Sequence, residues 1–557
     1  MLPYFGTCFH HCHATGPHLS QTRCMGLRGL SRCSPRVLSP THQRPLPQLN
    51  SGSHDSSCRP KNRGLCLVAL RRSTIAVGEA LPHCDDYVKV VTMKLFLIAG
   101  ALALISAAHA QTIRLEAENG QIEKGEVQTE TGGFSGRGYV GDFADDAARV
   151  TFKIPPVKAG IYRLRIRYSS PYGEKGFDFK VNGVGSSGQF EPSKPFTWHN
   201  AGKIELKATT NTISIERGWG YFMLDAIELS PAVNAPLKPV PTTLVDSSAT
   251  PATRALYARL LRNYGSKTLS GQFDTPDTNY IRQQVGVLPS VYGTDLVEYS
   301  PSRREHGANP NGQTEAAIAR IKKTGQILTL TWHWNAPSGL IDGTYTNDEG
   351  KAVEAPWWRG FDADATRFDL QKTLANPNGL DARLLRRDID AIAVELKKYQ
   401  DAGIPVLWRP LHEAPGAWFW WGAKGPESFK SLWRMMYERL TIRHRLHNLI
   451  WTWAGDAKAS WYPGDSYVDI VGTDIYPEDS RDSLAGQFDA LKAQYDGKKP
   501  IALCEVGGVP DIARMKRFGV SWLYFASWTD DLGPKKVPVA ELKRRYTAPE
   551  VINIKPQ

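Results

Sequence analysis

Hydrophobic and polar residues alternate in short runs between residues 112 and 230, and glycine-rich turns separate these runs. The clearest runs span residues 113–118, 162–168 and 212–216. A period of two is typical of strands with one buried face. Because this stretch contains no helical period, we expect residues 111–230 to form an all-β, jelly-roll-like sandwich.

From about residue 246 the pattern changes to apolar runs that alternate with amphipathic stretches. The runs span residues 268–274, 288–295, 326–334, 405–413, 449–455, 468–476, 500–506 and 522–528. The clearest amphipathic helices between them are predicted at 381–402 and 426–446. Strands that alternate with helices indicate a parallel sheet. Eight such units predict a (β/α)8 barrel over residues 246–557, with its chemistry at the carboxyl ends of the strands.

Four prolines lie between residues 231 and 241, where the two patterns meet. This composition predicts a short, stiff linker over residues 231–245, which would restrict how the two domains are oriented.

Composition divides the chain again at Met93. Seven of the eight Cys precede this residue, whereas all sixteen Trp lie at or after Trp198. After Met93, a basic start, an apolar run and the triplet 108–110 (Ala-His-Ala) follow the order of a secretory signal peptide. We interpret residues 93–110 as that peptide, residues 1–92 as a disordered leader from an incorrectly chosen start, and the protein as secreted and extracellular.

Several classes of protein are disfavoured by these numbers. Residues 1–92 carry eleven Lys and Arg against four Asp and Glu, so the rest of the chain is only modestly basic and gives no nucleic-acid footprint. The apolar run after Met93 is too short and too alanine-rich for a membrane span. The crowded Cys and His of residues 8–13 lack the spacing of a zinc site. Cys504 alone remains after processing, so stability must come from packing.

Glu413 and Glu505 each stand at the carboxyl end of an apolar run, the fourth and the seventh. A carboxylate is costly to desolvate there, so it needs a partner or a task. Two carboxylates that face each other across a barrel mouth can cleave a glycosidic bond. The alternative is that both are structural and pair with Arg or backbone amides, because barrels host many chemistries.

Motifs at five strand ends carry a resemblance that covers residues 246–557. They are Arg409-Pro410-Leu411-His412-Glu413 with Trp418, Trp332-His333-Trp334, Gly472-Thr473-Asp474-Ile475-Tyr476-Pro477, Glu505 and Trp528. This region resembles glycoside hydrolase family 26, the β-mannanase family. The resemblance implies a general acid/base at Glu413 and a nucleophile at Glu505.

The same resemblance assigns substrate-binding roles around this pair. His412 would orient Glu413, and Tyr476 would hydrogen-bond Glu505. The remaining assignments are a sugar contact at His333, an aromatic wall at Trp418 and a stacking platform at Trp528.

Other residues are interpreted from their local pattern. Trp357 and Trp358 lie in an irregular stretch where adjacent rings cannot both face one core, and we favour a distal sugar platform over a loop anchor. Trp433, on a helix with Met436 and Tyr437, is expected to be core. Strand alternation would turn Cys504 to the face opposite Glu505, which makes it a packing residue.

Residues 112–230 resemble a family 35 carbohydrate-binding module, through residues 115–118 (Leu-Glu-Ala-Glu) and 222–229. Such modules bind mannans or uronic sugars and often hold a structural calcium. Glu116, Glu118 and Asp225 would be its hard oxygen ligands, although ordinary exposed acids explain them equally well. The candidate ligand platforms are Tyr172, Trp198 and Trp219.

These observations predict a secreted, retaining endo-β-1,4-mannanase that acts on mannan, galactomannan or glucomannan. We expect a monomer that needs no catalytic cofactor and binds neither nucleic acid nor, after signal cleavage, a membrane. The alternatives are a β-1,3-xylanase or lichenase of the same family, or a non-catalytic carbohydrate-binding protein on a degenerate barrel. The presence of both Glu with His412 and Tyr476 argues against the last.

Overall fold

A computed structural model describes residues 112–555, which belong to one compact unit. The interpretations of residues 1–92 and 93–110, and the cleavage site before Gln111, lie outside the described residues. Within the described part, no helix has the length and apolar character needed to cross a membrane.

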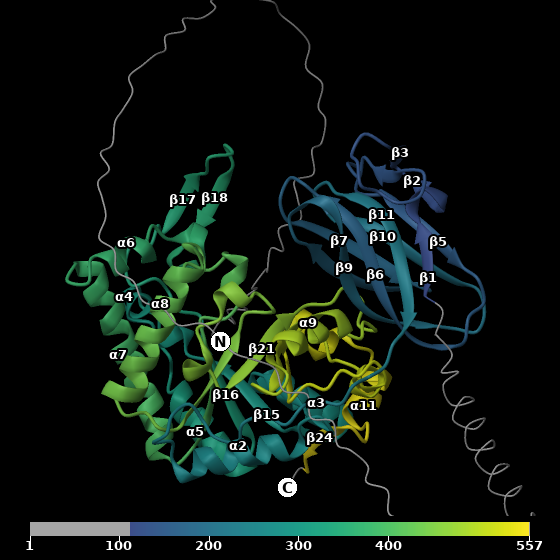
Figure 1. The fold of residues 1–557 in the computed structure, drawn as a ribbon. Coiled ribbons are helices and arrows are strands. Elements are labelled where there is room, and N and C mark those ends of the chain that lie inside the picture. Colours follow the sequence, from purple (N-terminus) through teal and green to yellow (C-terminus); the bar gives the residue numbers. More distant parts are fainter. Residues whose placement is uncertain (1–111, 556–557) are drawn as a thin grey trace, which may run out of the picture. The chain divides into compact units, whose positions relative to one another are not determined.

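Residues 113–231 form two antiparallel sheets that face each other (Figure 1). One sheet has the order β3-β4-β11-β6-β9 with β1 on β11, and the other β2-β5-β10-β7-β8. The strands are β1 (Ile113–Glu116), β2 (Gln121–Glu123), β3 (Glu126–Gln128), β4 (Tyr139–Gly141), β5 (Arg149–Ile154), β6 (Gly160–Ser170), β7 (Lys175–Val181), β8 (Val184–Phe190), β9 (Ser193–Leu206), β10 (Asn211–Trp219) and β11 (Met223–Pro231). The predicted sandwich is confirmed.

Alternation along the strands builds the core of this sandwich. On β10, Ile213 and Ile215 are fully buried, while Thr212 is exposed and Ser214 between the two isoleucines is only partly buried. Leu164 and Ile166 on β6 complete the same buried cluster from the other sheet. The period of two visible in the sequence is therefore the period of burial.

Eight parallel strands close into a barrel in the second half of the chain (Figure 1). They are β13 (Gly271–Phe273), β15 (Val291–Asp295), β16 (Ile327–Trp332), β19 (Val406–Pro410), β20 (Leu449–Ala454), β21 (Ile470–Ile475), β22 (Ile501–Val506) and β23 (Phe525–Ser527). Each lies within one of the eight predicted runs, so the (β/α)8 barrel is confirmed.

The first two predicted runs are longer than the barrel strands they contain. Their beginnings, β12 (Thr268–Leu269) and β14 (Leu288–Pro289), both pair with β24 (Val551–Ile554) in a small sheet outside the barrel. Tertiary pairing with the end of the chain therefore divides runs that look continuous in the sequence.

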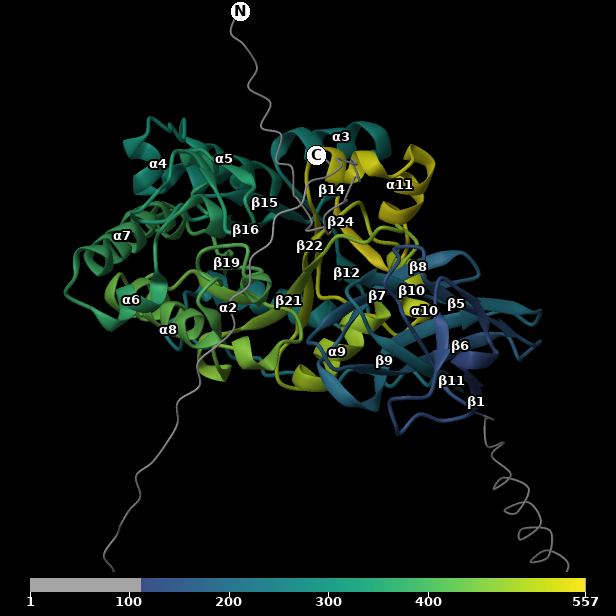
Figure 2. The same cartoon turned by 90° about the horizontal axis from the view of Figure 1, so that it is seen from above.

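Helices precede, connect and follow the barrel strands, as Figure 2 shows from a second direction. They are α2 (Pro251–Asn263), α3 (Thr275–Val285), α4 (Pro301–Glu305), α5 (Gln313–Thr324), α6 (Leu370–Ala375), α7 (Leu380–Asp401), α8 (Gly425–Tyr437), α9 (Ala485–Tyr495), α10 (Ile512–Arg517) and α11 (Val539–Tyr546). The predicted helix at 381–402 is α7. The helix predicted at 426–446 is α8 followed by a π-helix, Glu438–Arg443.

Apolar side chains cover both faces of the barrel wall and form two separate clusters. Leu407, Ile450 and Ala502 belong to one cluster, whereas their strand neighbours Trp408 and Trp451 belong to a second that includes the helices. Trp433 on α8 is fully buried in the second cluster, as predicted. The barrel is thus a packed core, and its open chemistry is limited to the strand ends.

The proline-rich connector follows the barrel surface. Asn234 donates its side-chain amide to the carbonyl of Arg517 (2.9 Å), and the Lys238 backbone N–H donates to Asp496 (2.8 Å). Lys492 on α9 donates to the carbonyl of Ala235 (2.6 Å). These bonds, added to the fixed φ of its prolines, restrict the connector.

Candidate active site

Glu413 leaves β19 in an unusual backbone conformation. Its φ of 53° lies in the left-handed region, as does that of Leu411, two residues earlier. Its N–H donates to the carbonyl of Ala454 at the end of β20 (3.0 Å). A non-glycine residue in this region costs free energy, which is a frequent property of active-site turns.

Glu505 reaches the barrel mouth through a β-bulge. The register between β21 and β22 shifts at Cys504, so Thr473 pairs with Leu503 and Asp474 already pairs with Glu505. Cys504 belongs to the same apolar cluster as Ala502 and Leu407, so its side chain lies on the inner face of the barrel wall. Glu505 bonds Arg409, which is two residues after Leu407 on β19 and therefore lies on that same face. The expected opposite orientation of Cys504 and Glu505 was therefore wrong, because the bulge interrupts alternation. Cys504 is nevertheless a buried packing residue.

Glu505 is surrounded by hydrogen-bond donors. It is only 2% exposed, and it accepts from the Arg409 guanidinium and from the Tyr476 hydroxyl. Arg409 also donates to Asp474 (2.6 Å). Both oxygens of this buried carboxylate therefore have a donor, and the arginine contributes a charge-assisted hydrogen bond.

Sequence reasoning did not assign a role to Arg409 or Asp474, although both stand inside the motifs quoted above. Both side chains are essentially unexposed. A buried charged residue within a strand was the signal available for each, because such a residue needs a partner of opposite charge.

Glu413 has a different environment. Its carboxylate accepts one hydrogen bond from the indole N–H of Trp418 (3.0 Å). Burial raises the pKa of Glu413 well above its ordinary value, and the negative charges of Glu505 and Asp474 raise it further. The end of β19 therefore favours a protonated carboxyl group.

Two histidines, one just after β16 and one just after β19, contact each other beside Glu413. The rings of His333 and His412 meet edge to face, with centroids 4.6 Å apart. Nδ1 of His412 lies 3.2 Å from the Thr331 hydroxyl, and Nδ1 of His333 bonds Asp295 at the end of β15. Asp295 also accepts the His333 backbone N–H (3.1 Å). Sequence reasoning missed this aspartate. Because it binds Nδ1 of His333, it leaves Nε2 as the nitrogen that faces away from it.

Trp528 and Trp418 provide aromatic surfaces at the mouth. Trp528 follows β23, with its ring 5.0 Å from that of Phe273 and 6.2 Å from that of His333. Trp418 is 52% exposed, whereas Phe419, Trp420 and Trp421 after it are buried. Trp418 is therefore the one exposed ring among these four residues of the loop after β19.

Comparison with known proteins matches this geometry to one family. The sequence pattern described as glycosyl hydrolase family 26 matches residues 245–556. The chain belongs to glycosyl hydrolase family 26. It is a glycoside hydrolase, and the pattern of carbohydrate-binding module family 35 matches residues 113–232 ahead of the family 26 barrel.

Individual relatives share both regions. A mannan endo-1,4-beta-mannosidase of Thermothelomyces thermophilus is 40% identical over 74% of this chain and 84% of its own length. Mannan endo-1,4-beta-mannosidase B of Piromyces sp is 33% identical over 83% of this chain and 80% of its own. The crystal structure of a Podospora anserina GH26-CBM35 beta-(1,4)-mannanase is 41% identical, covers 80% of this chain and 98% of its own, and superposes with a TM-score of 0.56.

Trp357 and Trp358 of this family 26 chain lie beyond a hairpin, β17 (Gly343–Thr346) and β18 (Ala352–Ala355), in a short 3-10 helix. Trp357 packs between His306, whose ring is stacked at 5.7 Å, and Arg303 at 5.3 Å. Trp358 is 43% exposed, and its carbonyl accepts from Arg303. The two rings therefore differ: Trp357 is held by its neighbours, and Trp358 presents an open face.

The three candidate platforms of the family 35 module lie in different surroundings. Trp198 on β9 is half-buried, with the guanidinium of Arg165 over its ring at 4.8 Å and that of Arg114 at 5.4 Å. Tyr172 and Trp219 are exposed at the loop end of the sandwich. An aromatic face occupied by arginines has less surface to offer a sugar.

The three acids proposed as calcium ligands gather in one corner of the module. The Ser135 hydroxyl lies 2.6 Å from a Glu116 oxygen and 2.9 Å from an Asp225 oxygen, while Arg114 pairs with Glu116 and Arg167 with Asp225. Across residues 112–555, no three His, Cys, Asp or Glu are placed so that they could hold a metal ion. Two of the three carboxylates, those of Glu116 and Asp225, therefore have arginine partners.

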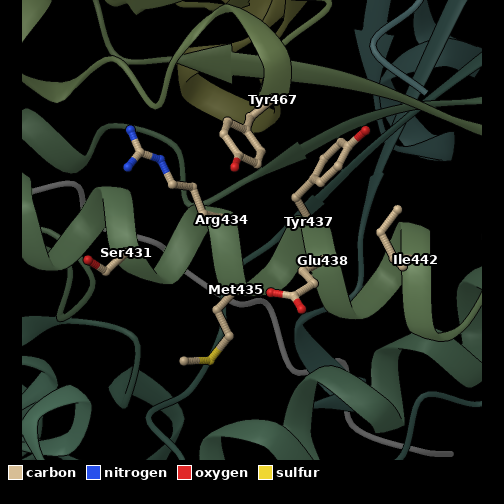
Figure 3. Close-up of a pocket in the computed structure, with 7 residues that line it drawn as sticks. All are labelled: Ser431, Arg434, Met435, Tyr437, Glu438, Ile442 and Tyr467. Atoms are coloured by element: carbon tan, nitrogen blue, oxygen red, sulfur yellow. The ribbon is translucent and has the colours of Figure 1, made fainter. Parts of the chain in front are cut away.

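A surface pocket of about 480 Å³ lies on α8 and the π-helix that follows it (Figure 3). Its lining residues are Ser431, Arg434, Met435, Tyr437, Glu438, Ile442 and Tyr467. Neither Glu413 nor Glu505 lines it, so it is separate from the candidate active site.

Proposed function

We propose that this protein is a secreted, retaining endo-β-1,4-mannanase, with Glu505 as nucleophile and Glu413 as general acid/base. The observation that carries the proposal is the contrast between the two carboxylates. Glu505 is held by a guanidinium and a phenol, whereas the pKa of Glu413 is raised by burial and by nearby negative charge. One group suits attack in its charged form, and the other suits proton donation.

The reaction proceeds in two steps. A carboxylate oxygen of Glu505 attacks the anomeric carbon of a β-mannosyl unit, and the bond to the departing O4 breaks as the Glu413 carboxyl protonates that oxygen. In the second step Glu413, now ionised, takes a proton from water while the water oxygen attacks the anomeric carbon and releases Glu505. Two inversions give net retention.

The surrounding residues position these steps. Arg409 and Tyr476 each bond one oxygen of Glu505 and so hold the carboxylate in one orientation. Departure of Glu505 from the intermediate restores its hydrogen bonds to both donors. Trp418 keeps the Glu413 carboxyl beside the leaving oxygen, while His333, Trp418 and Trp528 contact the sugars.

Hydrolysis of mannan, β-1,3-xylan and lichenan measured side by side tests the substrate. We expect mannan to be cleaved with by far the highest kcat/KM. A preference for β-1,3-xylan or lichenan would assign the same carboxylates to a different β-glycanase. Proton NMR of the first-formed reducing end tests the stereochemistry, and an initial α-anomer from a β-linked mannan would refute retention.

Secretion belongs to the same proposal. The segment of residues 93–110 has the order of a signal peptide, and cleavage after Ala110 would leave Gln111 as the mature N-terminus. Mass analysis of the exported protein should find this terminus, cyclised or free. Recovery of peptides from residues 1–92 in the mature protein would contradict it.

Calcium in the module and a monomeric state also remain predictions. In the described corner, Oε2 of Glu118 is buried without a hydrogen-bond partner, which is the one feature that supports a cation there. Metal analysis of protein purified without chelator tests for calcium, and sedimentation equilibrium tests for a monomer.

A further inference from the structure

Two exposed aromatic rings stand together at the loop end of the module. Tyr172 follows β6 and is 73% exposed, and Trp219 ends β10 and is 44% exposed. Lys175 lies with its ammonium 5.6 Å from the Trp219 ring and donates to the carbonyl of Tyr172 (2.9 Å). Exposed aromatic rings beside an ammonium donor can stack against sugar rings and bond their hydroxyls. We call Tyr172, Lys175 and Trp219 the module platform.

The module platform is tied to the loop after the fifth barrel strand. Glu174 lies between Tyr172 and Lys175 in the sequence, and its carboxylate accepts from Lys458 (2.6 Å). Lys458 follows β20 and also bonds Glu191 of the module (3.1 Å). The Trp219 ring packs on the other side of this turn, against Gly176, where even a Cβ would lie 2.3 Å from the indole.

The loop after the sixth strand holds the module as well. Asp482, beyond β21, accepts from the Ser186 hydroxyl (2.7 Å), and Arg481 donates to the carbonyl of Gly183 (2.8 Å). The module therefore meets the loops that follow β20 and β21.

The order of the barrel strands shows which end of the cleft these loops border. Glu413 follows β19 and Glu505 lies near the end of β22, so β20 and β21 lie on one side of the line between the carboxylates, and β23, β13, β15 and β16 lie on the other. A glycan cleaved between the two carboxylates must cross that line. His333, Trp358 and Trp528 belong to the β16 and β23 side, and the module meets the opposite side.

Close packing fixes the module in this place. Figures 1 and 2 both show β9 beside α9, and Gly202 of β9 lies so close to α9 that a Cβ would be 2.6 Å from the backbone N of Gly486. The neighbouring Lys203 pairs with Asp489 of α9 (2.9 Å), and both side chains are nearly buried. A glycine-to-glycine contact next to a buried ion pair leaves little freedom for rotation.

We propose that the module platform is a remote subsite of the catalytic cleft, which binds the part of a β-mannan chain that leaves the cleft on the side of β20 and β21. The inference rests on the proposed mannanase function and adds to it a specific geometry. The module and the barrel bind one chain in series, instead of acting as a tether and a separate enzyme. A chain long enough to reach Tyr172 gains binding energy that a short oligosaccharide does not.

The test compares kcat/KM on soluble mannan with kcat/KM on mannotetraose, using the full mature chain. The wild-type ratio should fall about two- to tenfold for each ring removed in Tyr172→Ala and Trp219→Ala, because each ring contributes one aromatic contact. Trp198→Ala removes a module ring that lies on β9 under two arginines, and should leave the ratio at the wild-type value. An unchanged ratio in the double variant, or an equal loss in Trp198→Ala, would overturn the proposal.

A second pair of variants separates a subsite from an independent anchor. Lys458→Glu opposes Glu174 and Glu191, and Lys203→Glu opposes Asp489, so each weakens docking and leaves the module platform intact. Both should lose the same length-dependent advantage while still binding insoluble mannan. Retention of the advantage in both would show an independent anchor and refute the subsite. Absence of mannan hydrolysis by the wild type would instead refute the function proposed above.

Discussion

The ends of β19 and β22 carry the same residue type in opposite environments. Glu505 accepts from Arg409 and Tyr476, whereas Glu413 has one indole donor and is exposed to the negative charges of Glu505 and Asp474. The two glutamates become an acid and a nucleophile because their neighbours differ. The role of each glutamate therefore depends on the residues around its carboxylate, such as Arg409 on β19 and Asp474 on β21.

Removal of the nucleophile should produce the largest effect. Glu505→Ala is expected to lower kcat by about four orders of magnitude or more, because Glu413, the other carboxylate of the pair, serves as the acid and does not form the covalent intermediate. Mannan hydrolysis with a sensitive reducing-sugar assay gives the rate, and circular dichroism checks the fold. A variant near the wild-type rate would end the assignment of Glu505.

Neutralising the acid should cost less. Glu413→Gln is expected to lower kcat/KM on mannan by about 10²- to 10⁴-fold, the usual contribution of a positioned acid. On aryl mannosides with a good leaving group, formation of the intermediate should be nearly normal. The wild-type kcat/KM should fall at high pH as Glu413 loses its proton, and this limb should vanish in the variant. An equal loss on both substrates would contradict the assignment.

The third test weakens the environment of Glu505 without touching the carboxylate. Tyr476→Phe removes one hydrogen bond to a charged group, so kcat should fall about ten- to a hundredfold. Tyr462→Phe is the matched control, because the Tyr462 hydroxyl donates to Asp465 in a loop away from the carboxylates (2.9 Å). A similar loss in both variants would mean that the phenol supports the fold and not the nucleophile.

A substitution far from the two carboxylates should leave the different environments of Glu413 and Glu505 unchanged. We expect the wild type to release longer oligosaccharides early, including tetramers. Trp358→Ala removes the open ring and should shift early products toward dimers and trimers, with a change of about two- to tenfold in their ratio. Activity on the shortest substrates should be unchanged, because only remote binding is lost. Chromatography of early products, compared with Trp357→Ala, measures it. If the variant that combines Trp357→Ala with Trp358→Ala has an unchanged product profile, the two tryptophans only anchor their loop.

The smallest effect concerns stability. The folded protein holds the Glu413 proton above the ordinary pKa of 4.5, where the unfolded chain has lost it. The free energy of unfolding therefore falls as pH rises from that value through the raised pKa. Glu413→Gln removes this penalty and should raise Tm at pH 7 by about 1–3 °C, with a smaller change at pH 4. Calorimetry at both pH values measures it, and a lower Tm at pH 7 would contradict the raised pKa.

Much of the architecture could be predicted because it follows from local periodicity. The alternation of Ile213 and Ile215 on β10 and the eight apolar runs each require only a buried face. The runs that begin at residues 268 and 288 were predicted as too long, because β24, nearly three hundred residues away for the first, pairs with their beginnings. No local pattern contains that partner.

The residues at the barrel mouth can also be separated into those that the sequence predicts and those that only the folded structure places there. The sequence by itself determined which carboxylates end strands four and seven, and with them the eightfold order of strands. Only the tertiary structure decided that a bulge at Cys504 turns Glu505 into the mouth, that Arg409 joins Asp474 to Glu505, and that Asp295 holds His333. Strand periodicity is a property of neighbours along the chain, whereas the charge state of a buried group depends on residues that only folding brings together.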